Sequence, residues 1–160
     1  MKTRLYLDTS VPSSFFDTSK PIRQLVTQKW FEHESSEYLL VSSVVAFDEI
    51  GKMSNFEKRD NILSLFREFN ISILDITDTS RELARLYIAN GAIPKSEIED
   101  ALHIAIATEN HIESLVSWNF KHIVSVNPIR KIHEINLKQG FEEVVIGSPE
   151  MFGGYKYGNL

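Results

Sequence analysis

The chain has 160 residues, 42% of them hydrophobic and 24% charged, which is the size and composition of one globular domain. The absence of cysteine excludes disulfide bonds, thiolate metal sites and a cysteine nucleophile. The formal net charge of −5 argues against passive phosphate binding, although an acidic centre attracts nucleic acid once divalent cations fill it. No signal-peptide pattern is visible and no run approaches the roughly 18 apolar residues of a membrane span, so we expect a cytoplasmic protein with no membrane partner.

Short strand-like runs alternate with helical patterns along the chain, which predicts an α/β fold with a parallel sheet flanked by helices. Strands are expected at 4–7, 38–41, 71–74, 115–116 and 144–146, the last at an edge of the sheet. Helices are expected at about 21–32, at 44–50, around 62–69 and 83–87, from about 97 through 107, and from 127 to Gly140. We expect one domain over residues 1–147 and a tail over 148–160 whose Gly-rich end, GGYKYGNL, is mobile.

Polar residues before the apolar runs predict where several helices begin. Ser42 or Ser43 should cap the helix that carries Glu49. A capping box pairs a Ser or Thr with a Glu three residues later. Such patterns occur at 54–57, 79–82 and 96–99. The last one opens a segment, 101–107, that is apolar except for His103, which indicates a helix buried at the centre of the fold.

Three carboxylates stand where a site is expected. Asp8 ends the first predicted strand, and sites of α/β folds lie outside the carboxyl ends of strands. Asp100 lies in the first turn of the apolar helix, where a carboxylate is costly to bury unless it lines a cleft, meets a cation or caps the helix. Glu49 lies on a helix that also follows a strand. Three carboxylates from three strand–helix connections can converge, and such oxygen ligands suit Mg²⁺ or Mn²⁺.

These polar residues also have purely structural interpretations. Asp8 can be a turn or N-cap residue, and Asp100 can complement the helix dipole. Asp48 is an equal candidate beside Glu49, and most helical glutamates are solvated. His103 lies three residues after Asp100, on the same side of the helix. It is either a core histidine satisfied by a hydrogen bond or a group that binds phosphate or orients Asp100.

Four segments of the chain resemble the motif blocks of PIN domains, a family that includes the VapC-type toxins of toxin–antitoxin pairs. They are LYLDTS, VSSVVAFDEI, EDALHIAIA and LVSWNFKHI, and the resemblance runs from Leu5 to about Ile146. It implies a three-layer α/β/α fold with a parallel sheet of about five strands. It also implies Mg²⁺- or Mn²⁺-dependent cleavage of RNA, a homodimer and, for a toxin, an antitoxin protein as partner.

The resemblance assigns roles to particular residues of this chain. The catalytic metal ligands of the family correspond to Asp8, Glu49 and Asp100, and its supporting polar positions to Ser10 and Ser117. Asn119 stands where many members carry a fourth aspartate. Its amide oxygen can bind a metal or its water but brings no charge, so a second metal site should be weakened most. The structural alternative is that Asn119 caps the following turn.

Two functional hypotheses follow. In the first, the chain is a ribonuclease in which a metal-activated water hydrolyses a phosphodiester bond. In the second, it is a catalytically weak or inactive PIN-like protein that binds RNA or a protein partner, an idea motivated by Asn119 and the acidic charge. An aspartate-nucleophile phosphatase is disfavoured because Ser10 stands where a second aspartate is usually needed. A phosphate loop is also disfavoured, since no Gly-rich segment ends in Gly-Lys-Ser/Thr.

Overall fold

The computed structural model describes residues 1–119, 123 and 125–153. Residues 120–122 of the LVSWNFKHI block lie outside the described residues, as does the tail beyond Gly153 that was expected to be mobile. Among the described residues, no helix combines the length and the apolar character that crossing a membrane requires.

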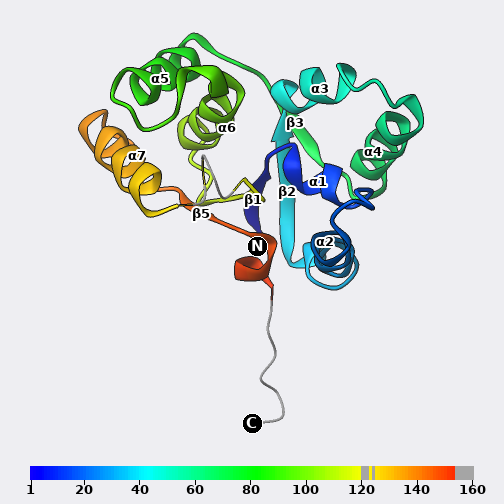
Figure 1. The fold of residues 1–160 in the computed structure, drawn as a ribbon. Coiled ribbons are helices and arrows are strands. Elements are labelled where there is room, and N and C mark those ends of the chain that lie inside the picture. Colours follow the sequence, from blue (N-terminus) through cyan, green and yellow to red (C-terminus); the bar gives the residue numbers. More distant parts are fainter. Residues whose placement is uncertain (120–122, 124, 154–160) are drawn as a thin grey trace.

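A five-stranded parallel sheet forms the centre of the fold (Figure 1). Its strands are β1 (Thr3–Leu7), β2 (Tyr38–Ser43), β3 (Ser72–Leu74), β4 (Ser114–Val116) and β5 (Val145–Gly147). They lie in the order β3-β2-β1-β4-β5, and every neighbouring pair is parallel. The chain builds one half of the sheet outward from β1 and then returns to the other side of β1 with β4. The carboxyl ends of β1 and β4 therefore flank the topological switch point, and the predicted parallel sheet is confirmed.

Helices cover both faces of the sheet, which gives the three-layer α/β/α architecture predicted from the sequence (Figure 1). One face is covered by α1 (Ser10–Ser14), α2 (Pro21–His33) and α4 (Phe56–Glu68), and the other by α5 (Asp78–Ala89), α6 (Ile98–Glu109) and α7 (Val126–Lys138). Because side chains alternate along a strand, β1 contributes to both cores. Leu5 and Leu7 are buried with α1, α2 and α4, and Tyr6 is buried with α5, α6 and α7. The end of β1 that carries Asp8 is therefore held from both sides.

The helix that carries Glu49, α3 (Val44–Gly51), begins directly after β2 at the carboxyl end of the sheet. Ser43 caps it, because the Ser43 Oγ accepts a hydrogen bond from Val45 N at 3.2 Å. Val45 packs in the core formed with α5–α7, whereas Ile50 packs in the core on the opposite face. Helix α3 therefore lies across the end of the sheet, and the predicted serine cap is confirmed.

The three predicted capping boxes are wrong in detail. Helix α4 is capped by Asn55, whose Oδ1 accepts from the backbone amide three residues later at 3.0 Å. Helix α5 begins at a capping box between Thr77 and Ser80, two residues before the predicted Thr79. Helix α6 follows a 3-10 turn, η2 (Lys95–Glu97), and has no side-chain cap. Where several capping residues are adjacent, the sequence pattern does not indicate which one has the extended backbone of an N-cap.

After β5 the chain forms a 3-10 helix, η3 (Pro149–Phe152), that packs against α2. The carbonyl oxygen of Phe152 accepts hydrogen bonds from Trp30 Nε1 at 3.3 Å and from the hydroxyl of Tyr38 at 3.2 Å. Tyr38 begins β2 and directly follows the short turn η1 (Ser35–Glu37). The segment after β5 is thus attached to the fold as far as Phe152. The domain boundary at residue 147 stays a prediction.

Candidate active site at the carboxyl ends of β1 and β4

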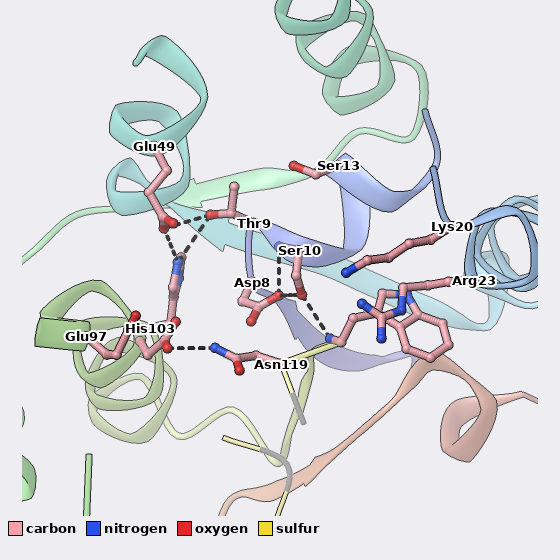
Figure 2. A pocket seen from close by; sticks show the side chains of 12 residues that line it. Asp8, Thr9, Ser10, Ser13, Lys20, Arg23, Glu49, Glu97, His103 and Asn119 are labelled. Carbon is pink, nitrogen blue, oxygen red and sulfur yellow. Dashed lines mark hydrogen bonds and ion pairs between the residues drawn. The ribbon is translucent and has the colours of Figure 1, made fainter. Parts of the chain in front are cut away.

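A cleft of about 600 Å³ opens where β1 and β4 end (Figure 2). It is lined by six of the residues singled out in the sequence, which are Asp8, Ser10, Glu49, Asp100, His103 and Asn119. Ser117 is fully buried and reaches the site through a hydrogen bond to Asp8. The other described lining residues are Thr9, Ser13, Lys20, Arg23, Glu97 and Trp118. Asp48, the alternative to Glu49, is exposed and does not line the cleft.

Asp8 is held in one orientation by two serines. Its Oδ1 accepts hydrogen bonds from Ser10 N at 3.0 Å and Ser10 Oγ at 2.5 Å, and its Oδ2 accepts from Ser117 Oγ at 2.5 Å. Each serine oxygen in turn accepts a backbone amide of the segment after β4, that of Trp118 and that of Asn119 respectively, both at 2.9 Å. Burial raises the pKa of Asp8, against the opposing effect of a nearby positive charge and of these hydrogen bonds. The carboxyl group is therefore fixed between β1 and the chain that leaves β4.

His103 connects Glu49 to the buried side of the site. Its Nε2 lies 2.7 Å from Glu49 Oε1, and its Nδ1 lies 2.7 Å from the hydroxyl of Tyr6. The Tyr6 hydroxyl is also hydrogen-bonded to Ser43 Oγ, the cap of α3, at 2.7 Å. Nε2 faces a carboxylate, which only accepts hydrogen bonds, so Nε2 carries a proton and donates to Glu49. His103 thus connects the carboxylate of Glu49 to the buried Tyr6 of β1.

The surrounding charges favour the protonated form of His103. Burial lowers the pKa of His103, but the hydrogen bond to Glu49 and the charges of Asp8, Glu49 and Asp100 outweigh burial and raise it overall. Burial alone would raise the pKa of Glu49, but His103 and the 2.8 Å hydrogen bond from Thr9 lower it below its ordinary value. Among the described contacts, the hydrogen bonds of His103 run to Glu49, Tyr6 and Thr9 rather than to Asp100. His103 is thus a satisfied core histidine that also positions a carboxylate of the cleft.

Asp100 faces the cleft from the first turn of α6. Its Oδ2 accepts a hydrogen bond from Asn119 Nδ2 at 2.7 Å. Burial raises the pKa of Asp100 to about 7, and the negative charges of Asp8, Glu97 and Glu49 add to the rise against the opposing charge of His103. Negative charge is therefore concentrated in this half of the cleft beyond what its single histidine neutralises.

The raised pKa of Asp100 predicts that the metal-free protein loses stability as pH rises from about 4 to about 7. The unfolded chain has lost this proton above its ordinary pKa of 3.8, whereas the native state still holds it up to about 7. The free energy of unfolding should fall by at most about 1.4 kcal/mol per pH unit in that window, less because Asp100 is partly exposed. Urea denaturation in EDTA at several pH values measures the slope. Asp100→Asn should flatten it and Asp48→Asn should not; an equal slope in both variants would contradict the assignment.

The chemistry of the cleft fits a hard divalent cation. Carboxylate and amide oxygens are the ligands that Mg²⁺ and Mn²⁺ prefer, and a cation would relieve the repulsion that raises the pKa of Asp100. Within the described residues, no three His, Asp or Glu side chains are gathered closely enough to hold an ion as they stand. Glu49 is turned toward His103 and Asp100 toward Asn119. The donor set is therefore suitable, and its carboxylates are engaged with partners inside the protein.

Two basic residues of the cleft were not expected from the sequence. Lys20 and Arg23 lie on the side opposite Glu49 and His103 (Figure 2). The guanidinium carbon of Arg23 lies 5.1 Å from the centroid of the Trp118 ring, within the range of a cation–π interaction. Nothing in the sequence distinguishes these residues from other surface cations, because they stand at the start of an ordinary helix.

A three-layer α/β/α fold with an acidic cleft at the carboxyl edge of its parallel sheet defines the class of this protein. The family model of the PIN domain matches residues 5–120, and the chain belongs to this family. The PIN-domain resemblance of the four sequence segments is thereby confirmed. PIN-domain nucleases generally use divalent metals.

Two solved structures share the fold at 12% sequence identity. One is VapBC2 from Rickettsia felis bound to a DNA fragment from their promoter, with a TM-score of 0.58 over 90% of this chain and 97% of that chain. The other is VapC20 of Mycobacterium tuberculosis, a toxin that cleaves the sarcin–ricin loop, with a TM-score of 0.56 over 88% of this chain and 98% of that chain. No curated protein matches the chain.

Proposed function

We propose that this chain is a metal-dependent ribonuclease that hydrolyses phosphodiester bonds of RNA with Mg²⁺ or Mn²⁺. The observation that carries the proposal is the meeting in one cleft of Asp8, directly after β1, Glu49 of α3 and Asp100 of α6. They are the catalytic metal ligands in this scheme, and Asn119 adds an amide oxygen. The family membership supports it, because PIN-domain nucleases generally use divalent metals.

A bound divalent ion supplies a water of lowered pKa and neutralises charge that develops on the phosphate oxygens. The protein prepares its carboxylates for that ion. Ser10 and Ser117 hold Asp8 by hydrogen bonds that favour its ionised form, and His103 does the same for Glu49. Asp100, with a pKa of about 7, is the carboxyl group that has to release a proton before it can act as a ligand.

We infer further that the chain is the toxin of a toxin–antitoxin pair. Both structural neighbours support this, one as part of VapBC2 and the other as a toxin. An antitoxin arginine could silence the cleft by pairing with its carboxylates in a bidentate geometry. The homodimer and the cytoplasmic location that we expected from the sequence stay predictions.

Calorimetric titration with Mn²⁺ tests the acidic site without any choice of RNA. We expect saturable binding by the wild-type protein and a loss of at least about tenfold in affinity for Asp100→Ala, since the variant removes a charged ligand from a partly buried site. Asp48→Ala is the matched control, because Asp48 is exposed and outside the cleft.

Binding should also release protons near neutral pH, which titrations in buffers of different ionisation enthalpy detect. Saturable binding that Asp100→Ala abolishes, together with Mn²⁺-dependent cleavage of RNA, would support the proposal. Binding that is unchanged in Asp100→Ala would contradict the ligand assignment.

One observation favours a second function, that of a catalytically weak or inactive PIN-like protein that binds RNA or a protein. Asn119 replaces the fourth acidic residue, and its amide donates to Asp100 at 2.7 Å. This hydrogen bond occupies an oxygen of a proposed metal ligand without adding negative charge. RNA binding by a protein that shows neither Mn²⁺ binding nor cleavage would identify this function.

A further inference from the structure

We propose that Lys20 and Arg23 form a phosphate-binding subsite, which holds the phosphate next to the scissile one in a single-stranded RNA. The inference rests on the proposed ribonuclease function and specifies how its substrate lies. The two cations face the carboxylates across one cleft, so a strand that reaches the carboxylates on one side extends over the basic residues on the other (Figure 2).

The position of Lys20 gives the most direct support for a phosphate-binding subsite. Its side chain is exposed, and it is directed into the cleft toward Ser10, the partner of Asp8 (Figure 2). Within the described part of the chain, no hydrogen bond or ion pair engages the ammonium group. An ammonium at the mouth of an otherwise acidic cleft is a point charge that suits a phosphate oxygen.

Arg23 is held in place by the same structure that fixes Asp8. Its guanidinium lies over the ring of Trp118, and Trp118 Nε1 donates to Thr27 Oγ1 of α2 at 2.9 Å. The backbone amide of Trp118 donates to Ser10 Oγ, which itself donates to Asp8. Arg23 is therefore connected to the proposed metal ligand through a continuous chain of contacts. A cation fixed in this way loses little side-chain entropy when it binds a phosphate.

The charges that line the cleft and the volume of the cleft indicate which kind of ligand it binds. Four carboxylates, those of Asp8, Glu49, Glu97 and Asp100, line the cleft and repel a polyanion, whereas Lys20 and Arg23 are the only Lys or Arg side chains among its described lining residues. A cleft of about 600 Å³ is the size of a small-molecule site and accommodates individual nucleotides of an extended strand. A phosphodiester linkage beside the cleaved bond satisfies both conditions.

The test measures binding and not cleavage. A fluorescein-labelled 2′-O-methyl oligouridylate is titrated in Mg²⁺ at several salt concentrations and followed by fluorescence anisotropy. We expect Lys20→Ala and Arg23→Ala each to weaken binding by about tenfold and to reduce the slope of log affinity against log salt by about 0.7. Lys29→Ala is the matched control, since Lys29 is an exposed lysine of α2, the helix that Lys20 precedes, and lies outside the cleft. Lys20→Arg keeps the charge and should restore most of the affinity.

The outcomes separate this inference from the ribonuclease proposal. Equal binding by Lys20→Ala and Lys29→Ala, or no binding by the wild-type protein, would overturn the subsite whatever the Mn²⁺ titration gives. A specific effect of Lys20→Ala in a protein that fails to bind Mn²⁺ would support the subsite and contradict only the catalytic proposal. Displacement of the oligonucleotide by an equal concentration of polyglutamate would overturn the phosphate assignment, because the basic residues would then fit an acidic protein segment equally well.

Discussion

Asp8→Asn should lower metal-dependent RNA cleavage by about a thousandfold or more, which corresponds to about 4 kcal/mol of transition-state stabilisation. The substitution removes one of the proposed negative ligands while keeping the shape of the side chain. The fold should tolerate it, because the Ser117 hydroxyl that now donates to Asp8 Oδ2 can turn and accept from an amide instead. Cleavage of RNA in Mn²⁺, followed on a gel over time, gives the rate.

Two controls make this result specific. Circular dichroism and thermal unfolding of Asp8→Asn establish that the variant is folded. Asp48→Asn removes an exposed carboxylate outside the cleft and should cleave RNA at the wild-type rate. Undiminished cleavage of RNA by a folded Asp8→Asn protein would contradict the assignment of Asp8 as a catalytic metal ligand.

His103→Ala should lower the free energy of unfolding by about 3 kcal/mol, since it removes a buried ring and a hydrogen-bonded charge partner. The loss stays below that of a fully buried ion pair because the Glu49 side chain is 30% exposed and can be hydrated. Tyr6→Phe removes only the hydroxyl, which bonds both His103 and Ser43, and should cost about 2 kcal/mol. Urea denaturation near neutral pH measures both values.

The loss of stability in His103→Ala should depend on pH, in a direction that follows from the raised pKa of His103. A histidine whose native pKa is raised contributes its full stabilisation below its ordinary pKa of 6.5 and loses it as pH rises through the native value. The difference between wild type and His103→Ala should therefore shrink in alkaline solution. His33→Ala, at an exposed position of α2, should change stability by less than about 0.5 kcal/mol at any pH. A small, pH-independent loss for His103→Ala would mean that His103 is not an imidazolium paired with Glu49.

Much of the fold could be predicted because buried segments are marked by apolar residues in the sequence. The apolar run of β1, which is buried on both faces of the sheet, and the apolar α6 were recognisable for that reason, and both are central elements of the structure. Helix α1 was missed because its five residues, SVPSS, have no apolar spacing. The choice of N-cap depends on the backbone conformation of one residue, which a pattern of several adjacent polar residues does not reveal.

The candidate site was predicted only in part, because sequence patterns are local whereas several contacts in the site join residues that are far apart in the sequence. Asp8 could be selected because it ends a strand, Asp100 because it opens an apolar helix, and Glu49 because its helix follows a strand. All three line one cleft. The hydrogen-bond partners are different. Thr9 meets Glu49 across 40 residues of sequence and Tyr6 meets His103 across 97, and no local pattern encodes such pairs. Their assignment depends on the register of the sheet and on the packing of α6 against it.

The two edges of the sheet limit how this protein can assemble. The edge strands β3 and β5 have three residues each, whereas β2 beside the centre has six. A strand from another molecule could add only a few ladder hydrogen bonds to such short edges, which protects the protein against edge-to-edge aggregation. If a second copy of the chain or an antitoxin binds this protein, we expect contacts with the helices or the cleft and no continuation of the sheet across the interface.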